Sequence, residues 1–258
     1  MERQIALVSG ASGGIGRGIA IELAKAGYDL MVHSSRDFPA AESLCDEMTR
    51  EYGCRAYAVE ADFTRKDAPD IVFEAFDEKF DRLDLYVNNA GVTEGAPFLE
   101  MTHETFDRVA NINFRSAYFC VQHAARRMVK MKIRGNIIVI SSNQQQVVMP
   151  RMSVYGPVKS SLMRFAKHAS MELAKYGIRV NSIAPGFTNS KNRTEQEQEH
   201  TMKFIPLRRW ATVEEVGQAV LYLVSPAARF ITGTCLLMDG GASNKHFDME
   251  AFDQGPDW

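Results

Sequence analysis

The sequence lacks the features that would assign it to a membrane or to nucleic acid. No apolar run reaches the roughly 18 residues that a spanning helix needs, and the opening segment MERQIALVSG does not have the three sections of a signal peptide. Thirty Lys and Arg residues nearly balance 32 Asp and Glu residues, so a net charge of −2 gives no long-range attraction for DNA, RNA or anionic lipid. We expect a cytoplasmic protein that binds neither nucleic acid nor membrane.

Cysteine is also scarce, and its placement excludes the common metal motifs. The four cysteines are scattered along the chain, with no CxxC pair and no histidine at metal-ligand spacing. Such isolated thiols are typical of reduced, structural cysteines. We therefore expect no metal. The four are Cys45, Cys54, Cys120 and Cys235.

What the sequence does contain is a regular alternation of two patterns. Seven short runs rich in β-branched residues indicate buried parallel strands, and longer amphipathic stretches lie between them. This alternation predicts an α/β protein, a doubly wound seven-stranded parallel sheet with helices on both faces. The expected strands are 5–9, 29–33, 55–60, 83–88, 135–141, 178–184 and 235–239. The expected helices are 15–26, 39–51, 67–79, 103–131, 153–176 and 212–224.

The chain shows no linker and no internal repeat, so one domain is expected over residues 1–241. Within it, the polar segment 189–205 follows the sixth strand, at the edge where doubly wound sheets bind ligands. We expect either a substrate lid or a solvated helix there. The tail 242–258 carries three aromatic residues, which we expect to dock at a subunit interface near the ligand site; the alternative is a frayed terminus. These are Phe247, Phe252 and Trp258.

A glycine-rich loop follows the first strand and opens the first helix. Glycines in this position allow a sharp turn and the close approach of a pyrophosphate, which the helix N-terminus stabilises. A glycine cluster alone is often only a tight turn, but a strand before it and a helix after it are the context of a dinucleotide site. The residues expected to bind are Gly10, Ser12, Gly14, Ile15 and Gly16.

The end of the second strand bears on the choice of cofactor. A carboxylate there would accept hydrogen bonds from the adenosine ribose and favour NAD(H), whereas a 2′-phosphate needs donors and positive charge. The sequence offers Ser34, Ser35 and Arg36, so we expect NADP(H) rather than NAD(H). The alternative is that Arg36 is an ordinary solvated loop residue. After the third strand, Asp62 and Phe63 are expected to hold the adenine, although an Asp there is also a common helix cap.

Tyr155 and Lys159 are four residues apart in a helical stretch and so share one face. An ammonium group beside a phenol favours the ionised form, which would let the tyrosine exchange a proton near neutral pH. Taken alone, this spacing is more often a surface pair. Gly156 and Pro157 lie between the two; if Ser153 caps the helix, Pro157 falls in the first turn, where proline is tolerated.

Further motifs complete an ordered set. Asn88-Asn89-Ala90-Gly91 follows the fourth strand, Ser142 follows the fifth and precedes Tyr155 by 13 residues, and Pro185-Gly186 follows the sixth. With the glycine loop, the segment 206–210 and Asp239-Gly240-Gly241, the chain over residues 4–241 closely resembles the single-domain short-chain dehydrogenase/reductase family. The resemblance implies a Rossmann-like fold, reversible hydride transfer between NAD(P) and a carbonyl/alcohol pair, and a homo-oligomer, usually a tetramer.

The resemblance also implies the role of each matching residue. Tyr155 is the acid/base, Lys159 assists it and binds the nicotinamide ribose, Ser142 orients the substrate oxygen, and Asn113 holds a proton-relay water. Ser141 would point to the other side of the strand end. Cofactor contacts are implied for Tyr155, Lys159, Asn89, Ala90, Gly91, Pro185, Gly186 and Thr188.

The sequence does not fix the substrate. Four consecutive amides, residues 143–146, follow the catalytic serine and slightly favour a hydroxylated substrate such as a sugar or polyol; the alternative is a polar loop facing water. Apolar residues in the segment 189–205 leave a 3-oxoacyl thioester or a hydroxysteroid open. An alternative function of a different class is that of a non-catalytic NAD(P)-binding regulator with the same fold.

Overall fold

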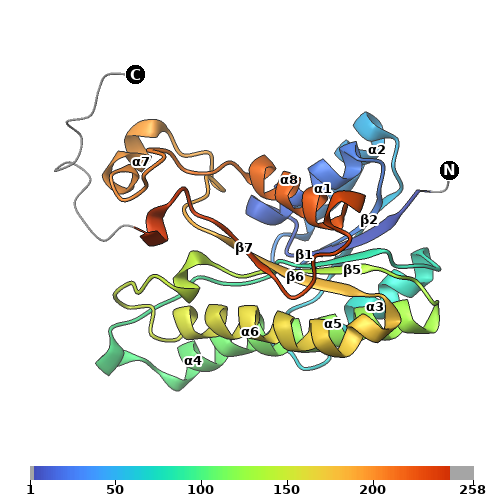
Figure 1. Ribbon diagram of the computed structural model, residues 1–258, viewed down its shortest axis with the longest axis horizontal. Coiled ribbons are helices and arrows are strands. Elements are labelled where there is room, and N and C mark those ends of the chain that lie inside the picture. Colours follow the sequence, from blue (N-terminus) through green and yellow to red (C-terminus); the bar gives the residue numbers. More distant parts are fainter. Residues whose placement is uncertain (1–2, 245–258) are drawn as a thin grey trace.

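The computed structural model describes residues 3–244, which form a seven-stranded sheet between two layers of helices (Figure 1). The strand order is β3-β2-β1-β4-β5-β6-β7 and every neighbouring pair is parallel. The fold predicted from the alternation is therefore confirmed, with strand ends displaced by two residues at most. The strands are β1 (Ile5–Ser9), β2 (Asp29–Ser34), β3 (Ala56–Glu60), β4 (Leu85–Asn88), β5 (Asn136–Ile140), β6 (Arg179–Pro185) and β7 (Cys235–Met238).

Helices cover both faces of this sheet, as Figure 1 shows. One layer contains α1 (Gly14–Lys25), α2 (Phe38–Tyr52) and α8 (Val213–Val224). The other contains α3 (Ala68–Lys79), α4 (His103–Ala110), α5 (Ser116–Lys130) and α6 (Tyr155–Leu173). Strands buried on both faces explain why their sequences are continuous apolar runs rather than alternating ones.

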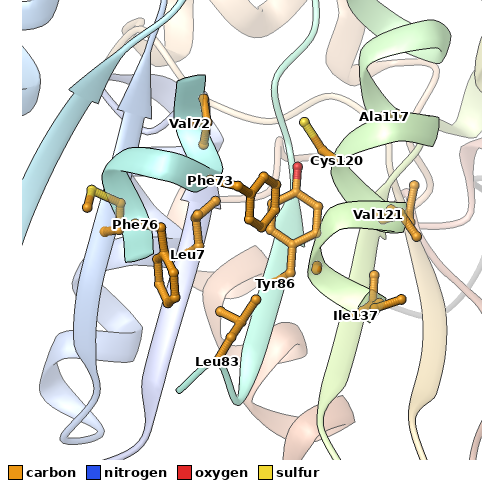
Figure 2. Packing of buried hydrophobic residues seen from close by; sticks show 14 of the residues in the cluster. Leu7, Val72, Phe73, Phe76, Leu83, Tyr86, Ala117, Cys120, Val121 and Ile137 are labelled. Atoms are coloured by element: carbon orange, nitrogen blue, oxygen red, sulfur yellow. The ribbon is translucent and has the colours of Figure 1, made fainter. Parts of the chain in front are cut away.

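The core beneath the second layer is built around Tyr86 of β4 (Figure 2). Its ring centroid lies 5.6 Å from that of Phe73. Leu7 on β1 and Ile137 on β5, the two neighbouring strands, belong to the same cluster. The buried hydroxyl donates to Asn88 Oδ1 at 3.1 Å, and burial raises the pKa of Tyr86 well above its ordinary value. Since each such side chain stabilises the fold by roughly 1.5–3 kcal/mol, the strands that carry the loops are held rigidly.

The helix predicted over residues 103–131 is interrupted. Between α4 and α5 the segment Asn111–Arg115 forms a π turn, in which the Ser116 N–H donates to the Asn111 carbonyl, five residues earlier. A π turn widens the helix by one residue and is frequent at functional sites. The periodicity of the sequence does not reveal it, because the apolar stripe continues through it.

The insert 189–205 contains α7 (Glu195–Met202), which lies beside the carboxyl ends of the strands (Figure 1). Its N-terminus is a capping box, in which Thr194 and Glu197 satisfy each other's main-chain N–H groups. At the end of the described region, Ala242–Asn244 form a 3₁₀ turn. Phe247, Phe252 and Trp258, for which docking was expected, lie outside the described residues.

Three further observations concern the described residues as a group. None of their helices has both the length and the apolar character needed to cross a bilayer. No group of three or more His, Cys, Asp and Glu side chains between residues 3 and 244 could hold a metal ion. All four cysteines are free thiols, and only Cys235 is partly accessible.

Candidate active site

A cavity of about 450 Å³ lies beyond the carboxyl ends of β1, β4 and β5. This is where the chain leaves β1 on one side and β4 on the other, the switch point at which doubly wound sheets bind ligands. It gathers most of the residues singled out from the sequence. Those lining it are Gly10, Ser12, Gly14, Ile15, Ser35, Arg36, Phe63, Asn89, Ala90, Gly91, Asn113, Tyr155 and Lys159.

The glycine loop is fixed from the side of β4. The Ser9 hydroxyl accepts from the N–H groups of Asn89 and Ala90 at 3.0 and 3.1 Å, and Asn89 Nδ2 donates to the carbonyls of Ser9 and Gly10. Gly10 has φ +66°, and a Cβ there would lie 2.8 Å from Ala90 Cα, so only glycine fits. Gly13 precedes α1 without a side-chain cap, which leaves the first turn available to an anion.

Gly16, also expected to bind, serves packing instead of lining the cavity. A Cβ at this position would lie 2.2 Å from the Gly10 carbonyl oxygen. Glycine is therefore required because α1 crosses the loop at backbone distance. Its contribution to binding is to let the helix N-terminus approach the loop.

The end of β2 separates the three residues expected at the ribose. Ser35 and Arg36 are exposed and line the cavity, whereas Ser34 is fully buried and its hydroxyl accepts from the Asp37 N–H at 3.1 Å. Asp37 in turn caps α2 by accepting from the Ala40 N–H. Within residues 3–244, Arg36 forms no ion pair, so its guanidinium is available to an anion.

The pair expected at the adenine is divided in a similar way. Phe63 is 1% exposed and one edge of it lines the cavity. Asp62 is exposed, does not line the cavity, and accepts from the Thr64 N–H at 2.9 Å. The aromatic ring is thus placed to contact a base, while the carboxylate stabilises the turn that follows β3.

Tyr155 and Lys159 meet at the inner end of the cavity. The Lys159 Nζ is 5.7 Å from the centroid of the Tyr155 ring and donates to the Ile140 carbonyl at 3.2 Å. Lys159 is only 4% exposed, yet no carboxylate in the described chain pairs with it. A buried ammonium with unused donors is costly unless a ligand supplies acceptors.

The two adjacent serines differ in which hydrogen is free. Ser141 Oγ lines the cavity but donates to the Lys159 carbonyl at 2.7 Å. Ser142 Oγ accepts from the Gln144 N–H at 3.2 Å and donates to no atom of residues 3–244. Only Ser142 has a hydroxyl hydrogen to offer a substrate, although Ser141 is the one that lines the cavity.

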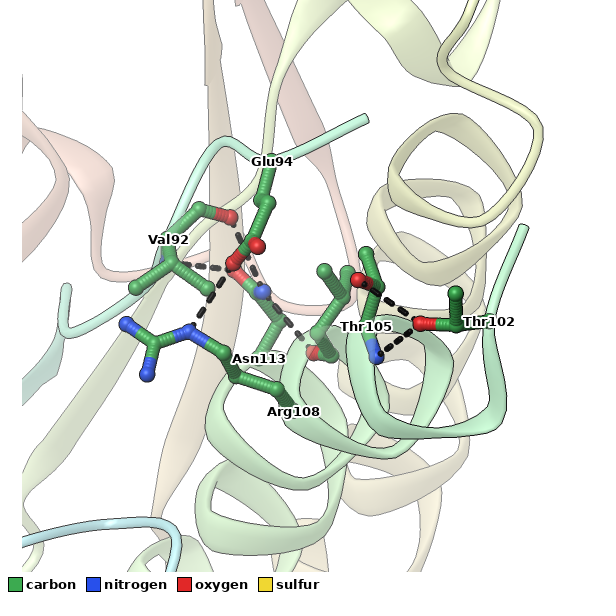
Figure 3. Close-up of polar contacts among 7 residues, drawn as sticks. Val92, Glu94, Thr102, Thr105, Arg108 and Asn113 are labelled. Atoms are coloured by element: carbon green, nitrogen blue, oxygen red, sulfur yellow. Dashed lines mark hydrogen bonds and ion pairs between the residues drawn. The ribbon is translucent and has the colours of Figure 1, made fainter. Parts of the chain in front are cut away.

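Asn113 fastens the π turn to the loop after β4 (Figure 3). Its Oδ1 accepts from the Val92 N–H at 3.2 Å, and its Nδ2 donates to the carbonyls of Val92 and Val109. Both amide hydrogens are therefore engaged. A relay water at this point would have to use the second lone pair of Oδ1 or a main-chain carbonyl of the turn.

The start of α6 corrects the expected cap. Val154, not Ser153, occupies the N-cap position, and no side chain caps the first turn. Tyr155 is thus the first residue of the helix, and Pro157 lies within its first turn, where its missing N–H costs no helical bond. Two bonds to the preceding loop hold this end, from Ser141 Oγ to the Lys159 carbonyl and from Ser160 Oγ to that of Gln145.

The loop after β6 contributes one residue that the sequence did not assign. Pro185, Gly186 and Thr188 do not line the cavity, and the Thr188 hydroxyl donates to the Gly186 carbonyl. Ser190 lines it instead, beside Gly14. In the resemblance Ser190 stands where a threonine often contacts the carboxamide of the cofactor, but it is not among the residues expected to bind. The other unassigned lining residues are Gly13, Val92, Thr93, Ile112, Ile140 and Ser141.

The four amides after Ser142 have different environments. Gln145 is committed, since its amide contacts Ser141 Oγ and Cys235 Sγ. Gln144 Nε2 contacts Met149 Sδ, and Gln146 is exposed. Asn143 is 9% exposed and its amide makes no hydrogen bond with any residue from 3 to 244. A Cβ on Gly186 would lie 3.3 Å from its Nδ2, so this amide faces the loop after β6.

Known proteins resemble this chain over almost its whole length. A family model described as enoyl-(acyl carrier protein) reductase matches residues 10–243. A 3-oxoacyl-[acyl-carrier-protein] reductase of Synechocystis is 35% identical over 92% of this chain and 96% of its own. Glucose 1-dehydrogenase 2 of Bacillus subtilis is 33% identical over 92% and 93%. The crystal structure of acetoin dehydrogenase from Enterobacter cloacae has a TM-score of 0.88 at 31% identity, covering 95% of this chain and 98% of that one.

Proposed function

Because the chain belongs to the short-chain dehydrogenase/reductase family, we propose that it interconverts a carbonyl compound and an alcohol with NADP(H), using Tyr155 as the acid/base. The observation that carries this proposal is the buried pair of Tyr155 and Lys159 at the end of a cavity that begins at the glycine loop. A purely regulatory nucleotide site would not need a buried ammonium beside a phenol.

The residues present fit a nicotinamide dinucleotide. The uncapped first turn of α1 suits the pyrophosphate, the Phe63 ring suits the adenine, and the unused donors of Lys159 suit the ribose hydroxyls. When bound, the nicotinamide supplies or accepts the hydride. The preference for a 2′-phosphate rests on Arg36, which is free of carboxylates, and on Ser35. Ser34 acts indirectly, by holding the main chain of Asp37.

In the reductive direction, two side chains act on the substrate oxygen. The Tyr155 hydroxyl, which has no partner in the described chain, donates its proton to that oxygen, and Ser142 Oγ donates a hydrogen bond to it. The Lys159 ammonium would stabilise the negative charge left on the Tyr155 oxygen, and its remaining donors would hold the ribose hydroxyls of a bound nucleotide. Asn113 fixes the π turn, which lines the same cavity.

The substrate class that the site favours is a small hydroxylated carbonyl compound. Asn143 lies directly after Ser142 and offers a free amide donor and acceptor, which would pair with a hydroxyl beside the reacting carbon. The names of the glucose and acetoin relatives agree with this class. A second candidate is a 3-oxoacyl thioester, which the name of the Synechocystis relative and three exposed apolar residues favour. They are Phe98, Leu99 and Val148.

Steady-state kinetics over these classes tests the proposal. The absorbance of the reduced nicotinamide is followed with hydroxyketones, sugars, 3-oxoacyl and enoyl thioesters and steroids, with NADPH and NADH in parallel. We expect turnover of a hydroxylated carbonyl with NADPH, and a loss of about 10²–10⁴-fold in kcat for Y155F with nucleotide binding retained. Near-normal turnover by Y155F, or nucleotide binding without turnover of any substrate, would refute it.

The preference for NADP(H) over NAD(H) is tested with a separate variant. R36A removes a charge-assisted contact worth about 1.5–3 kcal/mol, so the KM for NADPH should rise about 10- to 100-fold while the KM for NADH changes little. An equal change for both cofactors would assign Arg36 to a solvated loop.

Self-association is proposed through a groove of about 490 Å³ between α5 and α6. Apolar side chains from both helices form its floor and charged residues its rim, as in an interface between subunits. The apolar lining residues are Tyr118, Val121, Ala125, Val129, Phe165, Ala169 and Leu173.

A further inference from the structure

His33 is a buried histidine to which neither the motifs nor the reaction assign a role. It ends the apolar part of β2, is 0% exposed, and does not line the cavity. Every polar group of its ring is nevertheless engaged. A fully buried imidazole with two specific partners is a costly feature, which calls for a structural reason.

The ring joins two segments of the nucleotide site. His33 Nδ1 accepts from the Gly10 N–H at 3.1 Å, while Nε2 lies 2.9 Å from the Ala61 carbonyl oxygen. A main-chain N–H can only donate and a carbonyl can only accept. The imidazole is therefore neutral, with its single hydrogen on Nε2.

The same ring also supports the base. His33 and Phe63 are stacked, with centroids 4.1 Å apart and planes 17° from parallel. Phe63 in turn is one of the residues that line the cavity. Two segments on different strands, the turn after β1 and the turn after β3, thus take their position from one side chain on β2.

Gly10 has little else to fix it on this side. Its φ of +66° belongs to the left-handed region, where glycine is the most mobile residue. The β4 side holds its carbonyl through Asn89, and the β2 side holds its N–H through His33 and the next N–H, that of Ala11, through the His33 carbonyl. Without an acceptor at Nδ1, the Gly10 N–H would be buried and unpaired, and the loop would shift to find one.

We propose that His33 is a positioning residue for the dinucleotide: its neutral ring sets the glycine loop and the Phe63 wall at the spacing that a pyrophosphate and an adenine require. This inference rests on the proposed nucleotide-dependent function. His33 does not touch the reacting atoms, so its removal should weaken nucleotide binding and leave the chemical step unchanged.

Two isosteric substitutions separate the two bonds. In H33N the amide oxygen can replace Nδ1 as the acceptor for Gly10, whereas in H33Q the longer amide can replace Nε2 as the donor to Ala61 but offers Gly10 no acceptor. H33A lacks both. The matched control is H123Q. His123 is partly buried and, like His33, is stacked on a phenylalanine, Phe73, but it lies on α5.

Nucleotide affinity of the full-length protein is measured by fluorescence titration with NADPH and with ADP-ribose, which has no nicotinamide. We expect the Kd for both ligands to rise about tenfold in H33Q and H33A, because the buried Gly10 N–H loses its acceptor. H33N keeps that acceptor but loses the ring stacked on Phe63 and the bond to Ala61, so its Kd should rise clearly less than that of H33Q, while H123Q should stay within about threefold of the unmodified chain. With saturating NADPH, kcat and the substrate KM should be unchanged in all four.

Equal Kd values for H33Q and H33N, or a loss in kcat at saturation, would overturn the assignment. If H33Q does not fold, H33A against H33N makes the same comparison of the Gly10 bond. If the unmodified chain binds neither NADPH nor ADP-ribose, it is the proposed function that fails.

Discussion

At the scale of single residues, the site is defined by which hydrogens are already engaged. Ser141 has given its hydrogen to the Lys159 carbonyl, while Ser142 and Tyr155 keep theirs. Among the described residues, Lys159 Nζ donates to one acceptor, the Ile140 carbonyl. The free donors are therefore those that the proposed reaction would use, on Ser142, Tyr155 and Lys159.

The two serines give the first prediction. S142A should lower kcat about 10²–10³-fold, because it removes a donor to the developing oxyanion. S141A removes the bond to α6 and the contact with Gln145, so it should lower the free energy of unfolding by about 1 kcal/mol and change kcat far less. Stopped-flow or steady-state kinetics and urea unfolding of both variants test this prediction. A larger loss of kcat in S141A would exchange the two roles.

His33 gives a prediction about acid. Burial lowers the pKa of His33 from 6.5 to about 4. Between these values the unfolded chain binds a proton that the folded chain does not, so this residue makes stability fall as the pH drops through that window. From pH 7 to pH 5 the loss due to His33 is about 2 kcal/mol. Urea unfolding at both pH values should show a smaller decrease in H33N than in the unmodified chain; parallel curves would contradict it.

The motif residues were predictable from the sequence, because each belongs to a spacing that the fold repeats. The sequence could not separate Ser34 from Ser35, since burial depends on where β2 ends relative to β3. It did not place Ser190 beside the glycine loop, because that contact with Gly14 depends on how the insert folds back. Nor could it single out Asn143 among four amides, since that depends on contacts with Cys235 and Met149.

At the scale of secondary structure, the residues proposed to act in catalysis lie at interruptions of regular elements. Asn113 lies within a π turn, Ser142 precedes a 3₁₀ turn, and Tyr155 is the first residue of a helix without a side-chain cap. Strand and helix bodies follow from apolar periodicity, which the sequence displays. The interruptions follow from side-chain bonds to distant loops, such as that of Asn113 to Val92, which periodicity does not encode.

Two identical capping boxes give a prediction for elements. Thr212 caps α8, which packs against α1 in the core layer, and Thr194 caps α7 in the insert. T212A should lower the free energy of unfolding by about 1 kcal/mol and the Tm by about 2–4 °C, with KM unchanged. T194A should leave the Tm nearly unchanged and raise the substrate KM, because α7 belongs to the insert from which Ser190 reaches the cavity. Calorimetry and kinetics on the pair check this; the reverse pattern would exclude a substrate role for α7.

At the scale of the whole molecule, the sheet divides the work between its two sides. The glycine loop, Arg36 and Phe63 follow the strands β1 to β3. The residues proposed to react lie on the segments between β4 and β6. The helix layer beneath β4 and β5 leaves an apolar groove between α5 and α6. The all-parallel order was predictable from the sequence, but the groove was not, because it is formed by residues that also satisfy a helical core pattern.

The groove gives a prediction about assembly. A169E places a carboxylate among the apolar side chains at its centre, where burying an unpaired charge costs several kcal/mol. We expect light scattering after size exclusion to show an oligomer for the unmodified chain and smaller species for A169E. K167E, two residues away at an exposed position of α6, is the control. A monomer in the unmodified chain would remove the proposed interface.

The strand order also bears on how such a chain can be recombined. In the proposed function, the segment up to α3 binds the adenosine half of the nucleotide and the segment from β4 onward holds the reacting residues, so the sequence order of the two functions matches their order in space. A single exchange point between α3 and β4 would then transfer nucleotide preference as a block. At the site, the contacts that cross this seam include those of Asn89 with Ser9 and Gly10 and of Ser190 with Gly14, and elsewhere β1 pairs with β4 and α1 packs against α8. Keeping these residues constant is then the condition under which a change of cofactor need not disturb the choice of substrate.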